Sequence, residues 1–102
     1  MTTNKMRAIH AGEILREEFL APLGITPHAL AMSLRVPAPR INDVVREKRA
    51  VTVDTAMRLA RYFDTTAQFW MNLQSTYDLK VAEKTLSKKI ESEVRQLQKK
   101  AA

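Results

Sequence analysis

The sequence has no cysteine, which excludes disulfides, thiolate catalysis and cysteine-based zinc sites. Its two histidines, His10 and His28, are too few and too isolated to form a metal site. No Ser/His/Asp or paired-carboxylate arrangement is evident, because the adjacent Glu17 and Glu18 fall on different faces of a helix. We therefore expect a protein that is not an enzyme, with no cofactor and no metal.

Long apolar runs are also missing from the sequence. No stretch approaches the roughly 18 residues that a membrane span needs. Residues 1–7 are polar overall and lack the apolar core of a signal peptide. Together with the absence of cysteine, these features favour a soluble, cytoplasmic protein that makes no membrane contact.

Glycine and proline, the residues that most often interrupt regular structure, are scarce. There are two glycines, and all four prolines lie between Pro22 and Pro39. Outside that stretch the chain is expected to be helical, and it shows neither strand-like alternation nor an internal repeat. A length of 102 residues suits one domain with a modest core. These observations predict an all-α fold.

Acidic residues are the minority among the charged ones. The 17 Lys and Arg outnumber the 11 Asp and Glu, which gives a formal net charge of +6. A basic balance favours polyanionic partners, either nucleic acid or anionic lipid. A merely solubilising surface charge is the alternative, and net charge alone does not distinguish them.

Capping residues and apolar spacing place the helices. The first is expected over residues 11–20, ended by Pro22 and Gly24. The second, over 27–34, begins with the Thr26 hydroxyl as N-cap and proline at the first helical position. Because Ala38 precedes a proline and is pushed out of the α region, the third is expected over 39–47. The remaining helices are expected within residues 52–63, 66–77 and 81–100. Thr52 and Asp54 are candidate caps for the first of these, and Thr66 is the candidate cap for the second.

Residues 26–45 have the pattern of a helix-turn-helix. Ala31 is a small residue where two short helices must cross closely, and Val36 is an apolar residue that fills the corner of the turn. Ile41 and Val44 supply the inward face of the second helix. This packing is typical of DNA-binding helix-turn-helix units, although helical hairpins that bind nothing are the alternative.

Charge supports the DNA-binding interpretation. Five basic residues and two acidic ones lie between residues 35 and 49, whereas the expected first helix has three glutamates and one arginine. A basic patch over the second helix of the motif is what phosphate binding requires. A helix face that is merely solvated more often mixes its charges evenly.

Several segments resemble those of HigA-type antitoxins, a branch of the Xre, lambda-repressor-like family. They are HAGEIL at 10–15, LGIT at 23–26, KRAVT at 48–52, AMRLARYF at 56–63, and FWMNLQ at 69–74 followed by YDL at 77–79. The resemblance covers about residues 9–80, and its last motif is the most specific. Two departures are Ala11, where the family usually has proline, and Arg35, where such turns commonly carry glycine. If the turn needs a positive φ, arginine is strained there.

The resemblance implies a lambda-repressor-like five-helix DNA-binding domain with an appended C-terminal helix. Together with the residue pattern at the two ends of the sequence, it divides the chain into a flexible N-terminal arm (1–9), a helix-turn-helix domain (10–80) and an amphipathic helix (81–102). It implies a homodimer that binds a palindromic operator in double-stranded DNA and neutralises an RNase toxin of the HigB type. The alternatives are a stand-alone transcription regulator without a toxin partner and a pure protein-binding module.

We predict a set of DNA contacts on and around the third helix. Arg40 is expected to read guanine or, alternatively, to contact phosphate. Asp43 is expected to pair with Arg40 or Arg46 at a spacing of three residues, with a contact to cytosine as the alternative. Ala38 is a poor N-cap that leaves N–H groups for a phosphate. The full set is Thr26, Ala38, Pro39, Arg40, Asn42, Asp43, Arg46, Lys48 and Arg49.

A second set of residues is assigned to dimerisation. The aromatic residues near position 70 have helical spacing, which indicates core or dimer contacts rather than base stacking. The C-terminal stretch has three interpretations: a dimerisation helix, a toxin-binding element or a frayed basic tail. We favour dimerisation, because its apolar residues recur at steps of four and three. The predicted dimerisation residues are Trp70, Tyr77, Leu86, Ile90, Val94 and Leu97.

Overall fold

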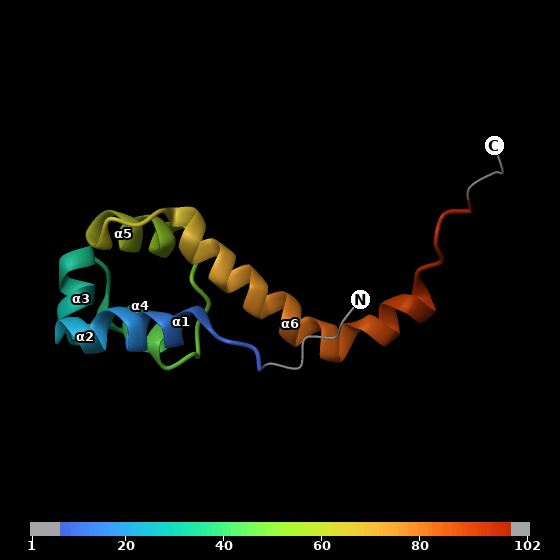
Figure 1. Cartoon of the computed structure of the whole chain (residues 1–102), viewed down its shortest axis with the longest axis horizontal. Coiled ribbons are helices and arrows are strands. Elements are labelled where there is room, and N and C mark those ends of the chain that lie inside the picture. Colours follow the sequence, from blue (N-terminus) through green and yellow to red (C-terminus); the bar gives the residue numbers. More distant parts are fainter. Residues whose placement is uncertain (1–6, 99–102) are drawn as a thin grey trace.

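The computed structural model describes residues 7–98, and within this range the regular elements are all helical. Figure 1 shows a globular end built from the elements before α6 and the first part of α6, from which the rest of α6 projects. The prediction of an all-α fold is confirmed. The elements are α1 (Ala11–Ile14), η1 (Leu15–Leu20), α2 (Ala21–Leu23), α3 (Pro27–Leu34), α4 (Ala38–Val45), α5 (Val53–Phe63) and α6 (Ala67–Glu93).

The first three elements form one continuous helix that is longer than predicted. It passes through Pro22 and ends at Gly24, whose φ of 65° allows a left-handed C-cap. Proline cannot donate the regular helical hydrogen bond. The helix widens to π geometry in η1, just before the proline, where the Ala21 N–H bonds to the Arg16 carbonyl. The prediction that this helix stops at residue 20, before Pro22, was therefore wrong, whereas Gly24 ends it as predicted.

The α3–turn–α4 unit follows the predicted helix-turn-helix closely. Thr26 Oγ1 accepts a hydrogen bond from the Ala29 N–H at 3.0 Å, and α3 begins at the predicted residue. Arg35 has a φ of 61°, so the turn does require the left-handed region although the residue is not glycine. Because α4 begins one residue early, Ala38 is helical, with Pro39 in the first turn, where a missing N–H costs nothing.

Helix α4 ends two residues earlier than predicted. Arg46 is its C-cap, and Glu47 has a φ of 63°, which stops the helix. The Lys48 N–H then bonds to the Asp43 carbonyl at 2.8 Å, so the chain folds back over the last turn. This fold-back brings the basic residues that follow α4 close to its exposed face.

The core lies between α4 and the helices that surround it. Gly12 is buried at the contact between α1 and α4, where an added Cβ would lie 1.8 Å from the Val44 carbonyl oxygen. A side chain of any size is excluded at that position. The buried hydrophobic residues are Ala11, Leu15, Leu20, Leu30, Ala31, Leu34, Ile41, Val44, Val45, Val51, Ala56, Leu59 and Trp70.

The predicted fifth helix and C-terminal helix form the single helix α6. Thr66 caps its N-terminus through the Phe69 N–H at 3.1 Å, as expected, but the helix has no break near residue 81. It ends at Glu93, because Val94 is an extended C-cap. Val94 and Leu97 therefore lie beyond the helix, and the predicted helical stripe retains Leu86 and Ile90. Of the predicted arm, residues 1–6 lie outside the described residues, and residues 7–9 are not helical.

Gln74 joins the inner part of α6 to the loop that follows α4. Its side chain is buried, and its Oε1 accepts a hydrogen bond from the Val51 N–H at 2.7 Å. Its Nε2 donates to Asp78 Oδ1 at 2.9 Å, so both ends of the amide are satisfied. The loop carrying Lys48 and Arg49 is thereby fixed to α6.

His10 caps the first helix and contacts α6. Its Nδ1 accepts a hydrogen bond from the Gly12 N–H at 2.8 Å, and its ring meets the Tyr77 ring edge-on at a centroid distance of 4.8 Å. The residue is buried, and this desolvation lowers the pKa of the imidazole against the opposing influence of Glu47 and Asp78. The cap requires the neutral ring, because a protonated Nδ1 has no lone pair to accept with.

The lowered pKa of His10 predicts a stability that decreases in acid. The unfolded chain binds a proton at this residue more readily than the folded one, so stability is lost as pH falls below the ordinary histidine value of about 6.5. Loss of the cap costs about 0.5–2 kcal/mol. The melting temperature of the parent should fall between about pH 7 and pH 5 by more than that of His10→Ser, which keeps a non-titrating N-cap. The exposed His28 is common to both proteins; identical pH profiles would contradict the assignment.

Candidate nucleic-acid interface

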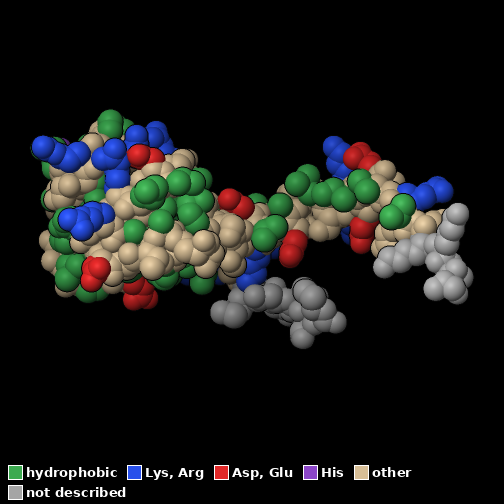
Figure 2. Space-filling model, turned by 90° about the horizontal axis from the view of Figure 1, so that it is seen from above, with side chains coloured by type: hydrophobic (Ala, Val, Ile, Leu, Met, Phe, Trp, Pro, Cys, Tyr) green, Lys and Arg blue, Asp and Glu red, His purple; other side chains and the backbone are tan. Residues whose placement is uncertain are grey.

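Helix α4 presents its polar face outward and its apolar face to the core. Ile41, Val44 and Val45 are buried, whereas Pro39 and Arg46 are exposed. The other predicted contact residues of α4 are half-buried; they are Ala38, Arg40, Asn42 and Asp43. In the view of Figure 2, Lys and Arg side chains gather over the globular end of the molecule.

Arg40 is held by residues of α5. Its Nη1 lies 2.5 Å from Asp54 Oδ2, and the same oxygen accepts a hydrogen bond from Arg58 Nε at 2.9 Å. Arg58 in turn donates through Nη1 to the Leu34 carbonyl at the end of α3, at 2.9 Å. The hydrogen bonds from Arg58 and Arg40 hold the pKa of the Asp54 carboxyl below its usual range. A carboxylate therefore bridges two guanidinium groups beside α4.

Asp54 and Arg58 were not among the residues predicted from the sequence for this site. Their spacing of four residues is a detectable signal for a pair on one helix face. The link from Asp54 to Arg40 spans 14 residues and joins two helices, so no local pattern reveals it.

Asp43 pairs with a different arginine from those predicted. Its Oδ2 lies 3.2 Å from Arg49 Nη2, and neither Arg40 nor Arg46 is its partner. The fold-back after α4 explains this, because it carries Arg49 over the exposed face of the helix. The prediction of a pair at a spacing of three residues was wrong.

Arg16 of the first helix stabilises the C-terminal end of α4. Its Nη1 donates to the Val45 carbonyl, and its Nη2 lies 3.3 Å from Glu47 Oε2. A cation at a helix C-terminus satisfies an unpaired carbonyl and complements the helix dipole. This role of Arg16 was not predicted from the sequence, where the residue entered only the charge count of the first helix.

The two helix N-termini of the motif differ in their capping. At α3 the Thr26 hydroxyl is already used by the Ala29 N–H. At α4 the N-cap is Pro37, which provides no side-chain hydrogen bond. Pro39 has no N–H, and the Arg40 N–H already bonds to the Pro37 carbonyl at 3.0 Å. The Ala38 N–H is therefore the first-turn donor left for an anion at this helix N-terminus.

Trp70 is not available for dimerisation, contrary to the prediction. Its side chain is 0% exposed, and its Nε1 donates to Thr65 Oγ1 at 2.8 Å. Its ring packs against Phe19 and Phe69 at centroid distances of 5.0 Å. The spacing that suggested core or dimer contacts therefore marks a core residue.

The other predicted dimerisation residues remain accessible. Tyr77 is half-buried against His10, whereas Leu86 and Ile90 on the projecting part of α6 are 44% and 49% exposed. Figure 2 shows hydrophobic side chains along this projecting part. Leu79 and Ala82 lie on the same stripe at helical spacing.

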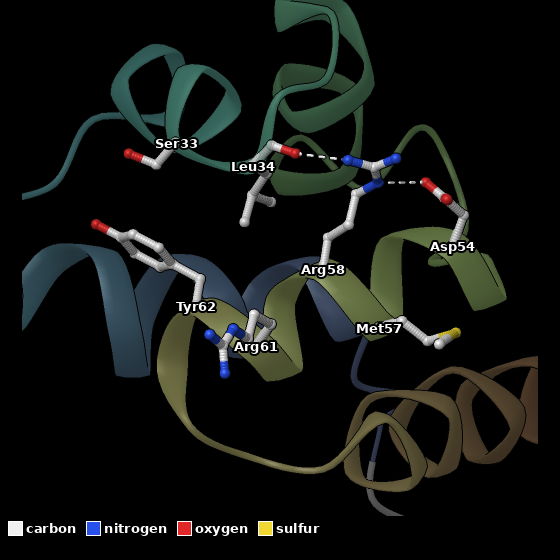
Figure 3. Close-up of a pocket in the computed structure, with 7 residues that line it drawn as sticks. All are labelled: Ser33, Leu34, Asp54, Met57, Arg58, Arg61 and Tyr62. Atoms are coloured by element: carbon white, nitrogen blue, oxygen red, sulfur yellow. Dashed lines mark hydrogen bonds and ion pairs between the residues drawn. The ribbon is translucent and has the colours of Figure 1, made fainter.

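An open groove of about 390 Å³ lies between α3 and α5, and Asp54 is among the residues that line it (Figure 3). Its lining combines the hydrophobic Met57 and Tyr62 with Arg58 and Arg61.

Residues 7–98 contain no group of three or more His, Cys, Asp or Glu placed to hold a metal ion. Over the same range no helix has the length and hydropathy needed to cross a membrane.

Comparison with known proteins identifies the family. A helix-turn-helix family model matches residues 15–70. The virulence-associated protein I of Dichelobacter nodosus is 60% identical over 80 residues, 78% of this chain and 74% of that protein. An uncharacterised helix-turn-helix transcriptional regulator of Haemophilus influenzae is 42% identical over 79 residues, 78% of this chain and 72% of that protein.

A solved structure resembles the chain over most of its length. It is that of the Pseudomonas aeruginosa antitoxin HigA with the higBA promoter, which has a TM-score of 0.87 and 56% sequence identity. The match covers 90% of this chain and 100% of that one. The chain therefore belongs to the HigA antitoxin branch of the helix-turn-helix family.

Proposed function

We propose that this protein is a sequence-specific DNA-binding antitoxin that represses its own operon and neutralises an RNase toxin in the cytoplasm. The observation that carries the proposal is helix α4, whose apolar face is fixed to the core while its polar face lies outward among basic residues. The similarity to an antitoxin that was solved with its promoter supports the same role here.

In the proposed complex α4 enters the major groove. Arg40 reads a base from one edge of the outward face, and Asn42 and Arg46 lie further along that face. Lys48 and Arg49 contact phosphates from the loop after α4, and the N-termini of α3 and α4, at Thr26 and Ala38, contact phosphate as well. Pro39 and Asp43 complete the surface facing the groove.

A homodimer would supply the second half of the interface. Two recognition helices read half-sites about 34 Å apart, so an interaction between protomers must hold them at that spacing. The projecting part of α6 suits this role, because an isolated helix with an exposed apolar stripe is only marginally stable without a partner. The stripe of Leu79, Ala82, Leu86 and Ile90 is the proposed contact.

The alternative function is a stand-alone transcription regulator without a toxin. The name of the Haemophilus influenzae relative, which mentions no toxin, favours it. Both functions require operator binding, so only a toxin partner distinguishes them.

The antitoxin function is tested by co-expression with the product of the neighbouring gene. We expect that product to arrest growth alone, to be harmless with this chain, and to co-purify with it. The same preparation should shift a duplex from the upstream promoter. A shifted promoter with a harmless, non-binding neighbour would instead establish the stand-alone regulator, and no shift would exclude both functions.

The phosphate role of Lys48 predicts an effect that does not depend on sequence. Lys48→Ala should weaken binding to operator and to unrelated DNA alike, and lower the slope of log affinity against log salt by about one. The matched control is Lys88→Ala, which removes the same charge from the projecting part of α6. A changed base preference with an unchanged salt slope would contradict the assignment.

The stripe on α6 predicts the oligomeric state. Leu86→Gln combined with Ile90→Gln should shift the protein toward monomer in light scattering and weaken binding to a palindromic operator by at least tenfold. The control pair, Thr85→Gln and Ser92→Gln, changes two exposed uncharged residues of the same helix segment. If the first variant remains a dimer with full affinity, another surface holds the protomers together.

A further inference from the structure

Arg40 of α4 and Asp54 and Arg58 of α5 form one hydrogen-bonded network. Arg40 Nη1 lies 2.5 Å from Asp54 Oδ2, and Arg58 Nε lies 2.9 Å from the same oxygen. The network continues through Arg58 Nη1 to the Leu34 carbonyl at 2.9 Å (Figure 3 shows the part from Asp54 to Leu34). It thus connects the end of α3, the start of α4 and the first turn of α5.

Asp54 lies at the centre of this hydrogen-bonded network. It lies in the first turn of α5, where a negative charge is favoured by the helix dipole. Two arginines keep the pKa of its carboxyl low, so it stays ionised at neutral pH. Arg58 is anchored to the backbone of α3, so the carboxylate has a defined position relative to α4.

The arrangement leaves Arg40 able to contact DNA. Among the contacts within residues 7–98, Arg40 engages the carboxylate through Nη1, and a guanidinium has five N–H donors. The remaining donors include the pair that a guanine O6 and N7 require. The side chain is 31% exposed, so part of it is accessible to a partner.

Folding stability does not account for the network of Arg40, Asp54 and Arg58. Asp54 and Arg58 are 53% and 42% exposed, and ion pairs at such exposure contribute little to folding. The network instead holds the long side chain of Arg40 in one rotamer. Arg40 therefore has less conformational freedom to lose when it binds DNA.

We propose that Asp54, fixed by Arg58, is a positioning residue that orients Arg40 for reading one base pair of the operator. The inference rests on the proposed function, in which Arg40 is the base-reading residue. Asp54 makes no base contact in this scheme. It determines specificity by presenting the guanidinium of Arg40 in a single orientation.

The test compares Arg40→Ala, Asp54→Asn and the double variant on the promoter duplex and on duplexes that each carry one changed base pair. Arg40→Ala should lose about tenfold or more discrimination at one position of each half-site. Asp54→Asn should lose discrimination at that same position, and the double variant should lose no more than Arg40→Ala. Melting temperatures measured in parallel show that each variant is folded.

Asp64→Asn is the matched control. It removes the same charge from the other end of α5, where asparagine also tolerates the positive φ of 57°. It should raise affinity for all duplexes slightly, as Asp54→Asn does through charge alone, yet retain discrimination.

Two results would overturn the inference while leaving base reading by Arg40 intact. One is full discrimination by Asp54→Asn at the position that Arg40→Ala affects. The other is operator binding by Asp54→Asn that is clearly tighter than that of Asp64→Asn, with undiminished discrimination, which would mean that Asp54 competes with DNA for Arg40. If instead Arg40→Ala keeps the parent's preference at every position, the assignment of Arg40 fails, and the positioning role of Asp54 fails with it.

Discussion

The placement of α4 depends on the close approach of the first helix at Gly12. A Cβ there would lie 1.8 Å from the Val44 carbonyl oxygen, so the two helices can meet only at a residue without a side chain. His10 caps the first helix on one side of this contact, and Arg16 binds the Val45 carbonyl on the other. The orientation of the polar face of α4 is thus set by this backbone contact together with the buried apolar face of the helix.

Local rules predicted most of the elements that position the polar face of α4. Thr26 and the proline after it fixed the start of α3, and Thr52 and Thr66 cap α5 and α6 as expected. Arg35 was identified as a site where a positive φ is costly, and its φ is 61°. These predictions succeeded because capping and turn geometry depend on residues within a few positions of one another.

The failures involve contacts between residues distant in sequence or choices between competing local rules. The partner of Arg40 is Asp54, and the partner of Asp43 is Arg49, both fixed by how elements pack or fold back. The helix through Pro22 required a π turn that no composition rule signals. Helical spacing at Trp70 could not distinguish a domain core from a protein interface, because both bury the same kind of surface.

Helix α6 is one continuous helix whose inner end is bonded to the loop after α4, through Gln74 and the Val51 N–H. Its outer part bends away from the line of its inner part (Figure 1), and the path along the helix from Gln74 to Ile90 is about 24 Å at the usual helical rise. A tilt of about 5° at one end moves the other by about 2 Å over that length. In the proposed dimer, a partner bound to the outer end of α6 would therefore shift the loop after α4, and the angle at which it bound would set how well two such loops match the pitch of a double helix.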